Sequence, residues 1–399
     1  MINLYDHQKK IIEDDPKKVG LFLGVGSGKT RIALLLARES TLVICPKTQA
    51  EDGNWVREAK KLNLSINLTI ISKENFRRDH HLLSGYETVI IDEAHTVLGV
   101  TPNIRYVKRQ PIPKASQLFD NLVKYIERTK PKRFYLVTAT IIKSPMTVWG
   151  AGKVLGKEWD FYKFRDTFYI RIPMGFREVW KTKNDSQSKE YLASLVKKIG
   201  YTGRLNDYFD VPDQTFKTIH IELTEKQKKR IKEIPLEFPD PIVRIGKIHQ
   251  IENGVLSGDE FNKSEEFENG KIEKILELAL EFPKMVIFAK YTAQLKAIAK
   301  ALKDTRHNVL ELNGQTKDRG SLFKEANSLD SCILVVQSQI SSGWEVPDFP
   351  CVVFASKTYS FVDFDQSLGR VQRVNNIKKN IYISLVSRGT VDFAVEKCI

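Results

Sequence analysis

Two adjacent carboxylates, Asp92 and Glu93, stand where an apolar run ends. In the stretch TVIIDEAHTV (88–97), residues 89–91 are typical of a buried strand, and the acidic pair follows at once. A carboxylate at the tip of a buried strand is placed to hold a cation, and a second one to activate a water molecule. Taken alone, the pair would be better explained by a solvated acidic turn. Its meaning depends on the rest of the chain.

A glycine-rich segment, GVGSGKT (24–30), lies between an apolar run and an amphipathic helical pattern. Glycines at alternate positions let backbone N–H groups face a phosphate without interference from Cβ atoms, and the lysine that follows would reach the β- and γ-phosphates. The hydroxyl of the last residue would bind Mg²⁺. The longer GxxxxGK[ST] pattern lacks its first glycine, whereas the shorter GxGKT form is intact. The predicted nucleotide-binding residues here are Gly26, Ser27, Gly28, Lys29 and Thr30.

A phosphate-binding loop gives the acidic pair a role. Nucleoside-triphosphate hydrolysis on such a loop needs an aspartate on a neighbouring strand to hold Mg²⁺ and a base to orient the attacking water. We therefore predict that Asp92 holds Mg²⁺ and that Glu93 activates water, with ATP and Mg²⁺ as cofactors.

Composition indicates the kind of partner. The chain has 399 residues, which favours two domains, and its net charge of +14 with a pI near 9.3 favours a polyanion, nucleic acid before an anionic membrane. No apolar run approaches the ~18 residues that cross a bilayer. The start of the chain does not resemble a signal peptide, so a cytoplasmic location is expected, or the host cytoplasm for a viral protein. The four cysteines form no CxxC pair, and no structural metal is expected.

Apolar runs alternate with helical patterns at both ends of the chain. This alternation predicts parallel sheets covered on both faces. The division that we predict is a first α/β domain at 1–150, an aromatic and basic, then helical, extension with a linker at 151–269, and a second α/β domain at 270–399. The apolar runs of the first domain are 19–24, 41–46, 68–72, 88–92 and 134–140, and those of the second are 284–290, 308–314, 332–338, 351–356 and 381–387.

The motif DEAH (92–95) together with GSGKT resembles the superfamily II helicases and translocases. The resemblance implies an α/β fold of two RecA-like parallel-sheet lobes around an ATP cleft, with helical insertions. LYDHQ (4–8) is similar to the adenine-reading motif, which implies that Gln8 contacts adenine. His95 and the threonines of LVTAT (136–140), Thr138 and Thr140, would couple hydrolysis to movement.

The resemblance continues in the second domain. VVQSQISSGWEV (335–346), with Gly343, is similar to the motif that touches both ATP and nucleic acid. QSLGRVQR (366–373) matches QxxGRxxR, which implies that Gln366 takes part in coupling and that Arg370 and Arg373 meet the γ-phosphate. Arginines of this kind can raise the hydrolysis rate by ~10³–10⁵. Lys29, Glu93 and these two arginines are thus the predicted catalytic residues.

Within the superfamily, the chain is most similar to the SWI/SNF-like duplex translocases. NWVRE, with Asn54, Trp55 and Glu58, and HIELTEKQ (220–227) carry this similarity. TAT stands where that branch usually has TGT, and GWEVP (343–347) is closer to the motor subunits of type I and type III restriction enzymes.

Two segments are candidates for nucleic-acid contact. Residues 100–133 hold nine Lys or Arg against two acids, and they are predicted to form a loop and then a helix. Arg105, Lys108 and Arg109 in that loop are predicted to grip phosphates ahead of the motor. Residues 151–183 interleave aromatic and basic side chains. Most of these aromatic side chains are predicted to be buried in a core, and fewer to stack on nucleic-acid bases.

The resulting hypothesis is a monomeric ATP-dependent DNA helicase or translocase that prefers duplex or branched DNA. RNA remains a second candidate track. A remodelling ATPase that displaces proteins from DNA without separating strands is the other alternative.

Overall fold

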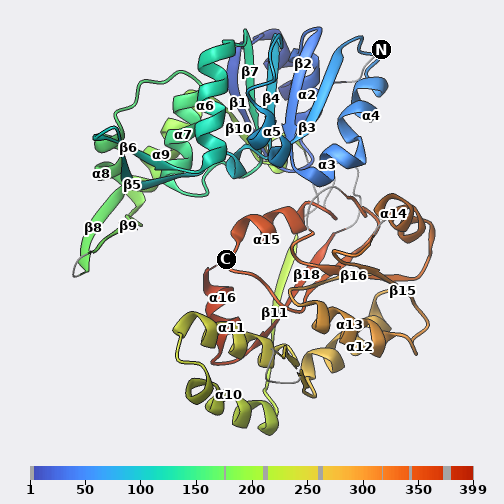
Figure 1. The fold of residues 1–399 in the computed structure, drawn as a ribbon. Helices are drawn as coiled ribbons and strands as arrows, with labels where there is room; N and C mark the ends of the chain where they lie inside the picture. Colours follow the sequence, from blue (N-terminus) through green and yellow to red (C-terminus); the bar gives the residue numbers. More distant parts are fainter. Residues whose placement is uncertain are drawn as a thin grey trace. The chain divides into compact units, whose positions relative to one another are not determined.

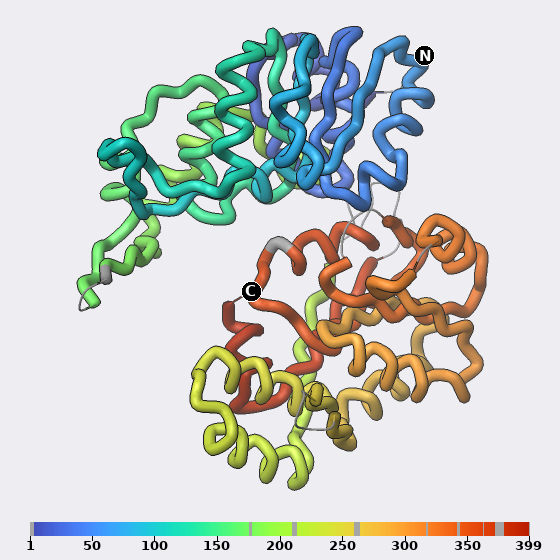
Figure 2. Tube along the Cα trace, viewed as in Figure 1, coloured from blue at the N-terminus to red at the C-terminus, as the bar shows by residue number. Residues whose placement is uncertain are grey.

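A computed structural model of the chain describes residues 4–174, 177–209, 214–258, 264–316, 318–340, 344–371 and 379–398. The chain divides into two compact units, Met1–Phe209 and Asp210–Ile399. Each unit is a parallel sheet covered by helices, and the units are the blue-to-green and the yellow-to-red parts of Figures 1 and 2. This architecture confirms the predicted class, two RecA-like α/β lobes.

The sheet of the first unit has the strand order β10-β1-β7-β4-β2-β3, and all its neighbouring strands are parallel. Its register places Asp92 beside Val137 and Val137 beside Leu21, so the segments that follow β1, β4 and β7 leave the sheet at one edge. The strands are β1 Lys18–Leu23, β2 Ser40–Cys45, β3 Asn67–Ser72, β4 Thr88–Asp92, β7 Arg133–Val137 and β10 Gly200–Gly203.

Helices cover both faces of this sheet (Figure 1). Successive residues of β4 show why: Val89 and Ile91 belong to one buried cluster and Ile90 to the other, because side chains alternate across a strand. The helices are α1 Asp6–Glu13, α2 Lys29–Leu36, α3 Lys47–Asp52, α4 Asn54–Lys61, α5 Lys73–Asp79, α6 Gln117–Thr129, α7 Pro145–Val154, α8 Phe161–Phe168 and α9 Ser186–Ile199, with 3₁₀ turns at Ala94–Thr96 and Leu205–Asp207.

The basic stretch differs from its prediction in one part. The segment predicted as a loop is a β-hairpin of β5, Val100–Val107, and β6, Gln110–Ala115, and the helix predicted after it is α6. Lys108 and Arg109 both adopt positive φ, 47° and 66°, and so close a two-residue turn that matches the twist of the strands. The prolines of this segment are tolerated because both strands of an isolated ribbon are edge strands.

The predicted middle segment, 151–269, is divided between the units. Residues up to 209 belong to the first unit, where β10 adds an edge strand beside β1, and those from 214 belong to the second. Phe161, Phe164 and Phe168 are buried in the core of the first unit, as expected of core aromatics. A second hairpin, β8 Tyr169–Met174 and β9 Arg177–Thr182, follows α8. The pairing of β10 with β1, which adds β10 to the first sheet, joins strands that are far apart in the sequence, so no local pattern indicates it.

The sheet of the second unit has the order β11-β18-β17-β14-β16-β15, again parallel throughout. Its strands are β11 Thr215–Ile221, β14 Lys284–Ala289, β15 Asn308–Leu312, β16 Cys332–Gln337, β17 Cys351–Phe354 and β18 Ile381–Ser387. Its helices are α10 Glu225–Glu237, α11 Pro241–Glu252, α12 Gly270–Glu281, α13 Thr292–Leu302, α14 Arg319–Ser328, α15 Phe361–Leu368 and α16 Val391–Cys398, and a small ribbon pairs β12 Val255–Leu256 with β13 Glu265–Glu266. Within the described residues, no helix combines the length and the apolar character of a membrane span.

Candidate nucleotide-binding site

The loop between β1 and α2 has the backbone that its glycines predict. Gly26 and Gly28 adopt φ of 83° and 79°, in the left-handed region that side chains rarely enter. A Cβ on Gly28 would also lie 2.3 Å from the side-chain nitrogen Nε2 of Gln8. The Ser27 hydroxyl donates to the carbonyl of Gly24 at 2.7 Å and stabilises the turn. The loop therefore has the form of a phosphate cradle.

Lys29 opens α2 and turns back over this loop. Its Nζ donates to the carbonyl oxygens of Leu23 and Gly24 at 2.8 and 2.9 Å. Thr30 follows in the first turn of α2, where unpaired N–H groups and the helix dipole favour an anion. The positions of the lysine and the threonine fit the predicted contacts with phosphate and Mg²⁺.

Gln8, predicted to contact adenine, is held inside the protein. Its Nε2 donates to the Ser27 carbonyl at 3.1 Å, and its Oε1 accepts from the N–H of Tyr5 at 3.2 Å. Only 1% of the residue is exposed. Gln8 therefore supports the phosphate loop directly, and its contact with adenine stays a prediction.

Asp92 lies at the end of β4 with both carboxylate oxygens engaged. Oδ1 accepts from the N–H of Glu93 at 2.9 Å, and Oδ2 accepts from the indole N–H of Trp55 at 3.3 Å. Burial, with the charge of Glu93, raises the pKa of Asp92 to about 6. A carboxylate and a hydroxyl are hard oxygen donors of the kind that Mg²⁺ takes, so Asp92 and Thr30 fit this ion.

Glu93 adopts a left-handed backbone conformation, φ 46° and ψ 53°, which is uncommon outside glycine. A buried lysine, Lys73, supports this turn because its Nζ donates to the Glu93 carbonyl at 3.3 Å and also contacts the Thr96 hydroxyl. Burial lowers the pKa of Lys73. Lys73 is not among the residues predicted from the sequence; its only signal there is a lysine directly after the apolar run at 68–72.

The predicted coupling residues of the first unit meet on one hydroxyl. Thr138 Oγ1 lies 3.3 Å from Glu93 Oε2, 2.8 Å from His95 Nδ1 and 3.2 Å from the N–H of Thr140. Burial lowers the pKa of His95 to about 4, so its ring is neutral at pH 7. The DEAH and TAT segments thus form one hydrogen-bonded group; their role in coupling stays a prediction.

An aromatic cluster that the sequence motifs do not reveal backs the phosphate loop. The His7 ring donates from Nε2 to the Ser27 carbonyl at 3.0 Å and stacks on Tyr208 with ring centroids 4.0 Å apart. Tyr5 meets Phe209 edge-on at 4.5 Å. These residues stand at opposite ends of the first unit in sequence, so only the fold brings them together.

Tyr208 and Phe209 end the part of the first unit that the structure describes, and their segment is built onto the loop. The N–H of Gly24 donates to the carbonyl of Gly203 at 2.8 Å, and a Cβ on Gly24 would lie 3.2 Å from the nitrogen of Leu205. The phosphate loop is therefore fixed to the segment that leads into the second unit.

Replacing Tyr208 with alanine should raise the KM for ATP several-fold. An aromatic pair of this geometry contributes about 0.5–1.5 kcal/mol, and its loss would free the His7 ring that supports Ser27. Steady-state ATPase assays would measure the change. Tyr208→Phe keeps the ring and should behave like the unmodified protein; an equal KM for the alanine and phenylalanine variants would contradict this support.

In the second unit, Arg370 and Gln366 are both largely buried, at 9% and 8% exposure. The Arg370 guanidinium donates to the carbonyl of Trp344 at 3.2 Å. Two further predicted residues, Arg373 and Gly343, lie outside the described residues. The meeting of the arginines with the γ-phosphate therefore stays a prediction.

A buried polar cluster that the sequence did not reveal lies at the ends of β14, β17 and β18. Lys271 Nζ donates to Asn253 Oδ1 at 2.7 Å, to the carbonyl of Ala355 at 2.8 Å and to Asp392 Oδ2 at 2.5 Å. Lys271 and His249 hold the pKa of Asp392 well below its usual range, against the effect of burial. The cluster joins α11, α12 and α16 to the sheet.

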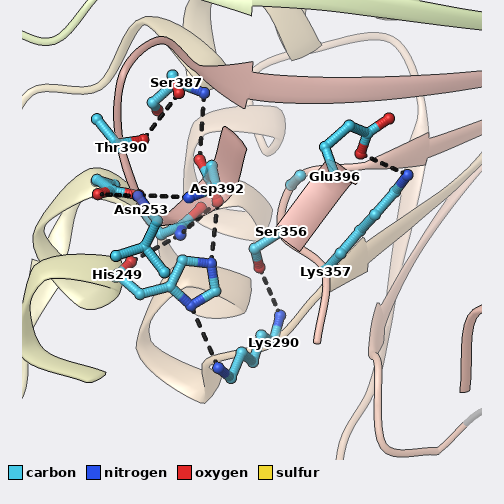
Figure 3. Close-up of polar contacts among 12 residues, drawn as sticks. His249, Asn253, Lys290, Ser356, Lys357, Ser387, Thr390, Asp392 and Glu396 are labelled. Atoms are coloured by element: carbon cyan, nitrogen blue, oxygen red, sulfur yellow. Dashed lines mark hydrogen bonds and ion pairs between the residues drawn. The ribbon is translucent and has the colours of Figure 1, made fainter. Parts of the chain in front are cut away.

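His249 extends this cluster towards β14. As Figure 3 shows, its ring lies between Asp392 and Lys290. Nε2 is 3.0 Å from Asp392 Oδ1, and Nδ1 is 3.2 Å from Lys290 Nζ and 2.9 Å from the Tyr291 hydroxyl. Because the lysine donates to Nδ1, the imidazole donates from Nε2 to the aspartate. The position of Lys290 at the end of β14 is thus set by a chain of buried groups.

The predicted phosphate contacts of the basic stretch are placed differently from one another. Arg105 pairs with Asp120 on α6, so its charge is already balanced. Lys108 and Arg109 are exposed at the turn of the β5–β6 hairpin. The turn residues are therefore the better candidates for contact with nucleic acid.

Comparison with known proteins assigns a family to part of the second unit. Residues 270–375 match the family described as helicase conserved C-terminal domain. This match shows that the second unit carries a helicase conserved C-terminal domain. No curated protein sequence matches the chain significantly.

Solved structures show the same fold. The chain is similar to the Pyrococcus furiosus Hef helicase domain, with 16% identity and a TM-score of 0.52 over 98% of this chain and 97% of that one. The Sulfolobus solfataricus SWI2/SNF2 ATPase core in complex with dsDNA matches at 18% identity over 99% of this chain and 90% of that one. The TM-score of this second match is 0.41. The likeness to the Hef domain shows the fold.

Proposed function

We propose that the protein is an ATP-dependent DNA helicase or translocase. The observation that carries this proposal is the hydrogen-bonded group of Glu93, His95 and Thr138 at the same sheet edge as the phosphate loop. This group joins Glu93, the candidate water-activating residue, to Thr138, which directly follows β7. A change in the bound nucleotide could therefore be passed on to the rest of the first unit. This arrangement suits a motor better than a simple nucleotide-binding module.

The residues of the first unit would divide the chemistry between them. The loop N–H groups and Lys29 bind the phosphates, and Asp92 and Thr30 hold Mg²⁺, which screens the phosphate charge when bound. Glu93 takes the proton of the attacking water. Arg370 and Arg373 are proposed, from the sequence alone, to stabilise the charge that develops on the γ-phosphate.

DNA is proposed as the track. The net charge of +14 and the exposed basic turn of the β5–β6 hairpin favour a phosphate backbone, and the helicase C-terminal domain fits this use. The similarity of NWVRE and HIELTEKQ to duplex translocases supports duplex or branched DNA over single strands.

The test is the ATPase rate on a panel of forked, four-way-junction, duplex and single-stranded DNA and of RNA. We expect the largest stimulation with duplex or branched DNA. Stimulation by RNA alone would mean that the protein moves on RNA and not on DNA. No stimulation by any nucleic acid would refute the proposal of a motor. Strand-separation and protein-displacement assays on the best substrate then divide a helicase from a remodelling ATPase.

Replacing Lys108 and Arg109 together with alanine should weaken duplex binding. For every DNA phosphate that a side chain no longer neutralises, the slope of log affinity against log salt becomes shallower by about 0.9. The slope should therefore fall by up to about 1.8, with the DNA-free ATPase rate unchanged. Arg105→Ala serves as the control, because that side chain is paired with Asp120; an unaltered slope in the double variant would make the turn an ordinary solvated surface.

A further inference from the structure

A pocket of about 260 Å³ opens beside the first residues of β1 and β10, at the sheet edge opposite the phosphate loop. Lys18 and Tyr201 line it, whereas the loop begins at Gly24 beyond the other end of β1. Since a strand rises about 3.3 Å per residue, roughly 20 Å separate the pocket from the loop. One nucleotide bound at the loop cannot also fill this pocket.

Lysines from three elements surround the pocket. Lys18 begins β1, Lys157 follows α7, and Lys197 and Lys198 end α9. All four are exposed, and among the described residues none of them has an ion-pair partner within 4.0 Å. An acidic group, Asp14, contacts one lining residue, because its carboxylate accepts a hydrogen bond from the Tyr201 hydroxyl at 2.7 Å.

The dipole of α9 explains only part of this cluster of lysines. Lysines in the last turn of a helix interact favourably with its dipole, which accounts for Lys197 and Lys198. It does not account for Lys18 and Lys157, which come from other elements. Cations gathered round one hollow repel one another, and an anion with more than one negative charge would relieve that repulsion.

Part of the pocket lining is apolar. Leu155 and Ile199 line it and are buried, at 7% and 3% exposure. Its volume of about 260 Å³ lies just below the range of about 300–1,000 Å³ that small-ligand pockets usually have, so it suits a small group, such as the phosphates of one nucleotide, and not a duplex. Four lysines beside the apolar Leu155 and Ile199 suit phosphates joined to an apolar part.

We propose that this pocket is a second anion site, which binds the phosphates of a nucleotide-like ligand. The ligand is either one unit of a single strand or a free nucleotide or polyphosphate. No residue of the candidate ATP site lines the pocket. The proposal therefore does not rest on the proposed function, and either can fail without the other.

The first test is residue-resolved lysine acetylation of the full chain, read by mass spectrometry. Short oligothymidine, AMP and inorganic tripolyphosphate are the three probes. We expect at least one to slow acetylation of Lys18, Lys157, Lys197 and Lys198 several-fold, while Lys229 and Lys232, exposed on α10, react as before. Protection by the oligonucleotide alone assigns a strand, and protection by a small probe assigns a free ligand. Unchanged rates with all three probes would overturn the site.

The second test compares matched variants with the probe that protects. Lys197→Gln/Lys198→Gln should lower its affinity several-fold, because two of the four lysine charges at the pocket are removed. Lys229→Gln/Lys232→Gln removes the same charge from α10 and should change affinity less than about twofold. Lys18→Gln/Lys157→Gln, outside any helix, should reproduce the loss if the first pair disturbs α9. Equal losses in the pocket and α10 variants would refute the pocket, whereas DNA-stimulated ATPase reports separately on the motor.

Discussion

Glu93→Gln should abolish turnover while ATP still binds. The amide keeps the size of the side chain but cannot take a proton from water, and a general base of this kind contributes about 10²–10⁴-fold to a rate. The charge that holds Mg²⁺ stays with Asp92. Single-turnover hydrolysis and nucleotide binding, measured on the same preparation, would show the two effects apart.

Lys29→Ala is the matched control, because it should weaken nucleotide binding itself. Its Nζ lies over the loop that the phosphates would occupy. The Glu93 variant should thus bind ATP without hydrolysing it, whereas the Lys29 variant should bind ATP poorly. Hydrolysis at the unmodified rate by the Glu93 variant would remove this residue as the base and leave the water to another group.

The second large effect is expected on stability. Lys271→Met should destabilise the second unit by about 3–5 kcal/mol, the usual cost of leaving one partner of a buried ion pair alone. Asp392 and Asn253 would lose their shared cation at a site where the lysine is 1% exposed. Urea unfolding, followed by hydrogen exchange in α12 and α16, would measure the loss.

A neighbouring lysine on the same helix provides the comparison. Lys274 pairs with Glu277 at the surface, and Lys274→Met should cost no more than about 0.5 kcal/mol. Similar losses in both variants would mean that the buried pair contributes nothing beyond an exposed one. The cluster also sets the position of Lys290, which follows β14. Hydrogen exchange in β14 of the Lys271 variant would therefore show whether α16 and β14 unfold together.

Much of the fold could be predicted because its signals are local. The runs at 41–46 and 88–92 are apolar throughout, as a strand covered on both faces must be, and they became β2 and β4. The basic hairpin was missed because Lys108 and Arg109 carry no glycine signal for their left-handed turn. The boundary between the units was missed because β10 is assigned to the first sheet by its pairing with β1, far away in the sequence.

The candidate chemistry follows from the amino-acid sequence alone. Gly26, Gly28 and Lys29 have the pattern of a phosphate loop, and Asp92 and Glu93 directly follow an apolar run. Their spacing is short, so the covalent chain fixes it. The contacts that support these residues appear only in the folded chain. His7 meets Tyr208, Lys73 meets the carbonyl of Glu93, and Lys271 meets Asp392 because separate strands and helices pack side by side. Contacts between residues far apart in sequence depend on strand order and helix packing, which no single segment encodes.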